Sequence, residues 1–315
     1  MSNAFNMELR AQQEWSWLLA IWLFLGGTGS GLFLVFLAFD LAPFYGAVAL
    51  ALILVGGVVL LLELGNPLRA WRGIFRAGTS WLSRGVLFVV LFIVSAFLSV
   101  GPRLEIVSWP APLDNSLAVR LLGWFAGLCA LMITLYPAFF FRSTSRAIPF
   151  WNTPLLPLFF VGYALLGGAG VVLLLDPISP APSQVALSAV ALIVIEAAMV
   201  AIHLAEMQRS GGSGRESVRL LNQAPLSWIF WLGVVLIGMV LPLVEILFIP
   251  STLVAAGAFL LLGGFLFRYS LLKAGVYIPP AVVPAGFDFS KLNRTSSEFE
   301  REYAGMTMHR AGRSG

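Results

Sequence analysis

Four ionisable side chains stand inside apolar stretches of the sequence, where a charge is costly and commonly serves a function. They are Glu63, Glu196, Glu245 and Arg268. His203 follows Glu196 by seven residues, so a helix would place both on one face. That stripe could relay protons, or each side chain could simply be neutralised by a group on another helix. The pattern favours neutralisation and leaves the relay open.

Tyr136 precedes Pro137 near the end of another apolar stretch. A phenol in a partly polar pocket can donate a hydrogen bond to a quinone carbonyl. Aromatic residues also gather at the membrane–water interface, as Trp15, Trp17 and Trp81 are expected to do. The pattern alone favours the interfacial interpretation for Tyr136.

Ligands for haem and metals are scarce. The chain has two histidines, His203 and His309, and a single cysteine, Cys129. His309 belongs to the polar C-terminal tail, so a bis-histidine haem cannot form between the helices. No His/Cys/Asp cluster has zinc-ligand spacing. We predict no haem and no metal in this chain, so the electrons of any redox reaction must arrive on another subunit.

The glycine-rich run at residues 26–31 (GGTGSG) is a weak candidate for a nucleotide loop. It does not fit G-x-G-x-x-G, and it stands inside an apolar stretch rather than between a strand and a helix. Small residues let membrane helices approach closely, so this run predicts helix packing.

The elements that position these residues are membrane-spanning helices. The chain is 59% hydrophobic and 11% charged, with a mean hydropathy of +0.91, whereas soluble domains carry about 25% charged residues. About eight runs are long enough to cross the hydrocarbon core, which predicts an all-α integral membrane protein. The runs are Trp15–Phe39, Tyr45–Leu64, Trp81–Val100, Ala118–Phe141, Pro154–Leu175, Val185–His203, Trp228–Phe248 and Thr252–Lys273.

The distribution of Lys and Arg predicts the orientation. Of 19 such residues, all but Arg103 and Arg120 fall at the face that holds both termini. The positive-inside rule then places both termini in the cytoplasm, which requires an even number of spans. We expect the membrane to be the inner membrane of a bacterium. The arginines of the loop after the second span have an alternative explanation, because they could serve to dock a partner.

We expect three regions along the chain. An N-terminal segment, 1–14, precedes a membrane domain, 15–278, in which two four-helix bundles cover about 15–141 and 154–274. A polar tail occupies 279–315. Within the membrane domain, Ser210–Gly214 is expected to be a flexible turn and nothing more.

Four stretches resemble the polysulfide reductase membrane-subunit family, also called the NrfD family. In order along the chain they read FLGGTGSG (24–31), LELGNPLRAWRGIFRAGTSWLSRG (62–85), IPFWNTPLLPLFFVGYALLGGAG (148–170) and GGFLFRYSLLKAG (263–275). The second and third are too long to be generic membrane sequence.

The resemblance implies eight helices in two bundles and a membrane anchor of a larger complex. Its partners would be a four-cluster ferredoxin-type iron–sulfur subunit and a molybdopterin catalytic subunit. Its own cofactor would be a quinone, either menaquinone or ubiquinone, bound near the face where the iron–sulfur subunit docks. The other contacts would be with membrane lipid, and we expect no nucleic-acid partner.

Residue by residue, the resemblance implies a docking loop at Gly65–Ser83, whose matching positions are Asn66, Pro67, Arg69, Ser80 and Ser83. Glu63 matches an acidic, proton-handling position beside the quinone. Tyr136 matches a tyrosine that faces the quinone, which reverses the preference stated above. Arg268 matches an arginine of the last helix that pairs with a buried carboxylate.

One turn departs from the family pattern. Some members have Asn and His on the first helix, where this chain reads Leu18, Leu19, Ala20, Ile21 and Trp22. This pocket would therefore hold a quinone by stacking on Trp22 more than by hydrogen bonds. The loss of polar residues keeps open a second hypothesis, a structural anchor without its own quinone site. Two bundles and several buried acidic residues also permit a third, an ion- or solute-translocating protein. The sequence does not indicate which substrate the catalytic subunit uses, because that chemistry belongs to another chain.

Overall fold

The computed structural model describes residues 11–12, 15–63, 78, 80–104, 116–144, 147–175 and 180–277. Within these ranges, eight helical segments are long and apolar enough to cross a membrane, which confirms the prediction of an all-α integral membrane protein. The segments are α1 (Trp17–Ala38), α2 (Pro43–Glu63), α3 (Trp81–Val100), α4 (Ser116–Thr144), α5 (Leu156–Leu175), α6 (Pro180–Ser210), η4 with α8 (Trp228–Val240 and Leu241–Phe248) and α9 (Leu253–Lys273).

The seventh span is irregular. Its first part, η4, is a π-helix, and α8 continues it without a break. Pro242 stands in the first turn of α8, where its missing N–H and its ring disturb the bonds to the preceding turn. Gly238, four residues earlier, packs directly against the backbone of Gly263 on α9. The π-helical segment thus contains the residue through which the seventh span packs on the backbone of α9.

The connection after α6 differs from the sequence-based prediction. Gly211 and Gly212 adopt positive φ angles of 71° and 51° and reverse the chain. The amphipathic helix α7 (Gly212–Leu221) follows at once and buries Ser217, Val218 and Leu221. The expectation of a flexible turn and nothing more at Ser210–Gly214 was therefore wrong. The two glycines make the turn, and a buried apolar face then holds a helix.

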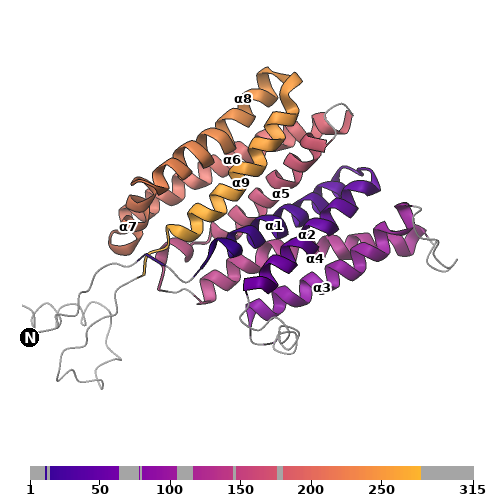
Figure 1. The fold of residues 1–315 in the computed structure, drawn as a ribbon, viewed down its shortest axis with the longest axis horizontal. Helices are drawn as coiled ribbons and strands as arrows, with labels where there is room; N and C mark the ends of the chain where they lie inside the picture. Colours follow the sequence, from indigo (N-terminus) through magenta and orange to yellow (C-terminus); the bar gives the residue numbers. More distant parts are fainter. Residues whose placement is uncertain are drawn as a thin grey trace, which may run out of the picture. The chain divides into compact units, whose positions relative to one another are not determined.

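Helices α1–α4 lie together on one side of the molecule, and α5–α9 lie on the other (Figure 1). Helices α1 and α5 connect the two groups: α1 packs on α2 and α4 as well as on α5, and α5 packs on α9 and α6. Their backbones nearly touch, because a Cβ on Gly31 would overlap the carbonyl group of Ala164. Gly168, one turn further along α5, lies against Gly31 and Leu32 in the same way.

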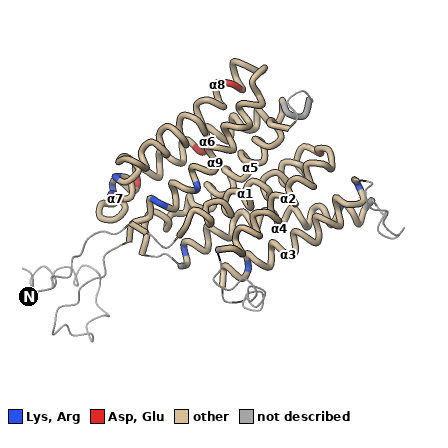
Figure 2. Tube along the Cα trace, viewed as in Figure 1, with Lys and Arg blue, Asp and Glu red and all other residues tan. Residues whose placement is uncertain are grey.

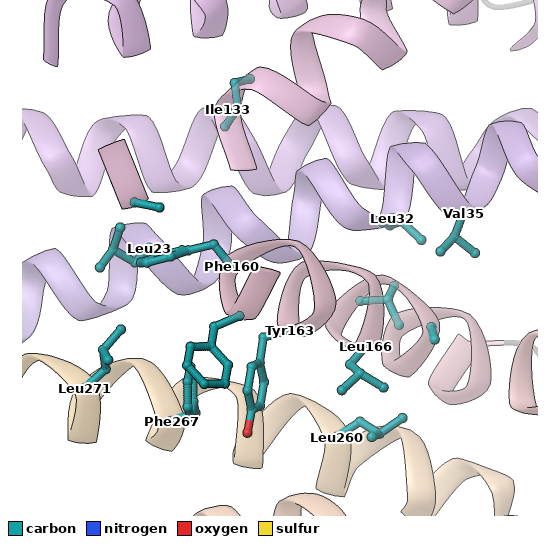
Figure 3. Close-up of a cluster of buried hydrophobic side chains, with 14 of the residues drawn as sticks. Leu23, Leu32, Val35, Ile133, Phe160, Tyr163, Leu166, Leu260, Phe267 and Leu271 are labelled. Atoms are coloured by element: carbon teal, nitrogen blue, oxygen red, sulfur yellow. The ribbon is translucent and has the colours of Figure 1, made fainter. Parts of the chain in front are cut away.

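Aromatic and aliphatic side chains fill the space beside this contact (Figure 3). The rings of Tyr163 and Phe267 stack with centroids 3.8 Å apart and an interplanar angle of 11°. The buried indole of Trp151, in the short helix η3 (Pro149–Trp151), donates a hydrogen bond of 2.8 Å to the carbonyl of Leu271. The start of the second helix group is thereby fixed to the end of the last helix.

The beginning and the end of the membrane domain meet at one face. The backbone N–H of Gln12 donates a 2.8 Å hydrogen bond to the Gly275 carbonyl, and Ala11 forms a β-bridge with Val276. Lys273 Nζ donates to the carbonyl of Trp15 at 3.2 Å. An even number of spans requires this arrangement. Charges are sparse along the described helices (Figure 2).

We expect Gly31→Ala to destabilise the protein by about 1–3 kcal/mol, because α1 and α5 must separate to admit the methyl group. The midpoint of thermal unfolding in detergent should fall by several degrees. Gly57→Ala on α2 is the matched control, since its new Cβ would meet nothing within 4 Å. Equal unfolding temperatures for the two variants would contradict the role assigned to Gly31.

Candidate functional site

Two cavities meet at Trp22 on α1 and Tyr136 on α4. One, of about 280 Å³, lies between the start of α1 and the end of α4 and is also lined by Trp15, Leu60 and Phe140. The other, of about 260 Å³, lies between α2 and α3 and shares Trp22, Leu60 and Tyr136. Together we call them the Trp22–Tyr136 pocket. It lies at the end of the membrane domain that carries the N-terminal segment.

The local sequence explains how two large rings fit between four helices. On α3, a Cβ at Gly85 would fall 2.5 Å from the ring of Tyr136, and on α2 a Cβ at Gly56 would fall 3.0 Å from the Trp22 indole. Pro137 follows Tyr136 inside α4 and lines the pocket. Because proline lacks an N–H, the helical bond to the carbonyl of Ile133 is missing at this point.

The described lining of the pocket is mostly apolar and contains one hydrogen-bonded pair of side chains. The Trp22 indole N–H donates to the Tyr136 hydroxyl oxygen at 2.8 Å, and both side chains are buried. Since the phenol oxygen accepts this bond, its own O–H remains able to donate to a ligand. The arrangement therefore presents the Tyr136 hydroxyl as a directed hydrogen-bond donor in a mostly apolar cavity. Trp22, which the sequence singled out as a stacking surface, also holds that hydroxyl through its indole N–H.

Two further predicted site residues, Glu63 and Ser83, belong to α2 and α3, the helices that border the pocket. Glu63 is the last residue of α2, three positions after Leu60 of the pocket, and its side chain lies outside the described residues. Asn66 and Arg69 lie outside them altogether. Ser83 is buried in the first turn of α3 without lining either cavity.

The described part of the predicted docking loop leads into α3. Trp81 stacks on Phe139 of α4 with centroids 4.7 Å apart. The Arg84 guanidinium lies 4.4 Å from the centroid of the Trp81 ring and donates to the Gly78 carbonyl at 3.0 Å. These contacts anchor the start of α3 against the end of α4, directly beside the pocket.

A second group of functional candidates lies among α5, α6 and α9, and we call Tyr163, Glu196 and Arg268 the polar cluster. All three side chains are at most 3% exposed. They are close enough to interact electrostatically. Arg268 donates to the Gly264 carbonyl at 2.8 Å. The described residues contain no ion pair within 4.0 Å between Arg268 and Glu196, so the implied pairing with a buried carboxylate is not a direct contact.

Several polar atoms of this region have no hydrogen-bond partner among the described residues. They include Arg268 Nε and Nη2, Glu196 Oε2, the Tyr163 hydroxyl and Thr28 Oγ1 on α1. Buried polar groups are almost always satisfied by protein or by water. The region is therefore suited to internal water molecules. Glycines give the charged groups their room: Arg268 Nη2 lies against Gly27, and Glu196 against Gly162.

A small cavity lies beside Trp22 and Tyr136, on the side of Gly27. A cavity of about 10 Å³, close to the size needed for one water, is lined by Trp22, Tyr136, Thr134 and Gly27. Gly27 in turn contacts Arg268. Gly27 of α1 thus lines this small cavity and also lies against Arg268 of the polar cluster.

His203 shares the buried interior of α6 with Glu196 but has different neighbours. Its ring centroid lies 4.8 Å from that of Phe150 and 5.7 Å from that of Phe159. His203 and Ser270 both line a small cavity of about 20 Å³. Among the described residues, no group of three or more His, Cys, Asp or Glu is placed to hold a metal ion.

The comparison with known proteins decides the family. The model of the family "Polysulphide reductase, NrfD" matches residues 6–280 of the 315. The chain belongs to the NrfD family. With its eight apolar helices it is a multi-pass membrane protein.

Three relatives illustrate how far the similarity extends. Protein NrfD of Escherichia coli is 28% identical, covering 87% of this chain and 98% of the relative. One component of the polysulfide reductase of Wolinella succinogenes is 27% identical, covering 84% of this chain and 92% of the relative. One component of the sulfite dehydrogenase of Allochromatium vinosum is 32% identical over 41% of this chain and 45% of the relative.

Sequence reasoning missed two features of the site. Tyr163 carries no signal beyond its place in an apolar helix, and only packing brings it to Arg268 and Glu196. The hydrogen bond from Trp22 to Tyr136 joins residues 114 positions apart. Both rings were singled out separately, and their contact depends on how α1 meets α4.

Proposed function

We propose that this chain is the quinone-reactive membrane anchor of a multi-subunit molybdopterin/iron–sulfur oxidoreductase. The observation that carries the proposal is the Trp22–Tyr136 pocket, with its single directed phenol among apolar walls. Two of the relatives are components of a polysulfide reductase and of a sulfite dehydrogenase, which supports a role as one part of an oxidoreductase complex.

The residues fit a quinone. A quinone ring is flat and apolar on its faces and carries carbonyl oxygens that need a donor. Trp22 supplies a ring face, and the Tyr136 hydroxyl supplies the donor. The cavity between α2 and α3 is bounded by Leu54, Val58 and Val90, each more than 40% exposed, so an isoprenoid tail can lie along that side toward the lipid.

A bound quinone takes up or gives two electrons and two protons. The chain positions it: Tyr136 donates to one carbonyl oxygen, and Trp22 holds the phenol through its indole N–H. The apolar lining excludes bulk water, so protons must come from groups of the chain. We assign that role to Glu63, at the end of α2 beside the pocket.

We propose an iron–sulfur protein of the four-cluster ferredoxin type as the partner that docks at this end. Electrons would pass directly between its nearest cluster and the quinone. The arginines of the loop after α2, including Arg69, would bind it. Most Lys and Arg residues fall at this face, so by the positive-inside rule it would lie, with both termini, in the cytoplasm of a bacterium.

Purification of the chain from native membranes in mild detergent tests the assembly. We expect a ferredoxin-like protein, a molybdopterin subunit, iron, molybdenum or tungsten, and quinone in the same fraction. Mass spectrometry and metal analysis of that fraction would show them. A single chain free of metals and quinone, recovered reproducibly, would overturn the anchor proposal.

Tyr136→Phe tests the quinone site. The variant loses the donor but keeps the ring, so we expect turnover with quinone to fall about tenfold, as expected for one lost hydrogen bond. Electron transfer within the purified complex to an artificial acceptor should be unchanged. Tyr269→Phe, at a half-buried tyrosine that lines neither cavity, is the control. Full quinone turnover in an assembled Tyr136→Phe complex would favour a purely structural anchor.

The polar cluster favours a second function, proton movement across the second bundle. Charged groups in the membrane interior are costly, and Arg268 and Glu196 have unpartnered atoms suited to water. Arg268 lies against Gly27, which lines a small cavity together with Trp22 and Tyr136 of the quinone pocket. We propose that Glu196, with His203 further along α6, relays protons linked to quinone turnover.

Replacing Glu196 with Gln removes the exchangeable proton and keeps the shape. In proteoliposomes, we expect the number of protons moved per electron to fall toward zero, because the relay loses the group that takes up and releases the proton. Glu196→Asp should recover part of the coupling. Glu216→Gln, on α7 at the protein surface, is the control. Unchanged proton movement in Glu196→Gln would eliminate the relay.

A further inference from the structure

A cavity of about 390 Å³ lies at the far end of the first helix group, opposite the Trp22–Tyr136 pocket. It is lined by Asp40 after α1, Arg103 in η2 (Pro102–Leu104), and Arg120 and Trp124 on α4. Its volume falls within the roughly 300–1,000 Å³ of small-molecule sites. Arg103 and Arg120 are the two basic residues that stand apart from the basic face. They converge on one cavity.

We propose that this cavity binds the headgroup of a phospholipid that carries both a phosphodiester and an ammonium group, as phosphatidylethanolamine does. The proposal is independent of the function assigned to the quinone pocket. It rests on the charges of the cavity, the turn that places Asp40, and the apolar face that continues from it.

The charges match such a headgroup. Arg103, Arg120 and Asp40 have exposed side chains, and the described residues contain no ion pair within 4.0 Å among them. Two guanidiniums, which are always protonated, favour a phosphate that accepts several hydrogen bonds. The carboxylate favours a cation beside it. An anion alone would meet repulsion from Asp40, whereas a headgroup with both charges satisfies all three residues.

The turn after α1 supports a role for the Asp40 side chain. The Leu41 amide donates to the Phe36 carbonyl at 3.0 Å, which closes a Schellman motif with Asp40 at its left-handed position. Asp40 has a φ of 46°, and glycine is the residue that usually occupies this position because it has no Cβ. The chain thus places a carboxylate where the backbone geometry alone would favour glycine.

An apolar face descends from the cavity along α4 and indicates a lipid rather than a free anion. Leu121, Trp124, Phe125 and Leu128 recur at helical spacing after Arg120. They are between 44% and 64% exposed. In a membrane, such exposed apolar side chains on a spanning helix face acyl chains. A headgroup in the cavity would place its acyl chains on this face.

The test uses the full chain in its native complex, stripped of loosely bound lipid in detergent. Native mass spectrometry should show phosphatidylethanolamine retained, and adding it back should raise the unfolding temperature by several degrees. In an Arg103→Gln, Arg120→Gln double variant, we expect retained lipid and the thermal shift to fall at least fivefold. Arg215→Gln, which removes a charge from α7, is the control and should behave as the wild type.

Asp40→Asn tests the ammonium group separately from the phosphate, because it removes the carboxylate alone. The turn is kept, since asparagine also tolerates the left-handed conformation. It should weaken binding of phosphatidylethanolamine and leave binding of phosphatidylglycerol, which has no ammonium, unchanged or stronger. Unaltered lipid retention in the double arginine variant would overturn the proposal. Equal stabilisation by inorganic phosphate would overturn the lipid in favour of a free anion. Equal binding of both lipids, unaffected by Asp40→Asn, would overturn the ammonium assignment.

Discussion

The arrangement of this protein depends on the direct backbone contact between α1 and α5. In lipid, apolar side chains gain little by leaving one apolar surface for another, so helix association relies on close packing and polar contacts. Gly31 and Gly168 permit that packing, because each lies against the backbone of the opposite helix. The contact holds the helix group that carries the pocket against the group that carries the buried charges. A side chain at Gly31 would therefore disturb both.

Small residues perform a second task in this molecule, which is to admit large or charged side chains to the interior. Gly85 leaves room for the ring of Tyr136, and Gly27 leaves room for the guanidinium of Arg268. The same short glycine-rich segment of α1 thus faces α5 at one position and Arg268 at another. This explains why a run that superficially suggests a nucleotide loop is needed inside a membrane helix.

The described residues place few polar or titratable groups in the interior of the protein. The Trp22–Tyr136 pocket contains one hydrogen-bonded pair, and the polar cluster contains groups that can exchange protons but no group of ligands for a metal among the described residues. These groups support the proposal that the chain binds an apolar redox molecule and handles protons around it. In the proposed function, the electrons pass to and from that molecule through a partner subunit.

The sequence by itself determined the membrane class, the eight apolar helices and the family, because length, hydropathy and long motifs are local properties of the chain. It also singled out Tyr136, Glu196 and Arg268, since aromatic and charged residues are conspicuous in apolar surroundings, and Trp22, which stands in the turn that departs from the family pattern. Only the tertiary structure decided which of them meet. Trp22 reaches Tyr136 through the packing of α1 on α4, and Arg268 faces Glu196 without a direct ion pair. The helix α7 also came from the structure, because a turn made by two glycines conceals the amphipathic pattern that follows. Contacts between distant helices depend on shape at every interface, and no single segment of sequence encodes that shape.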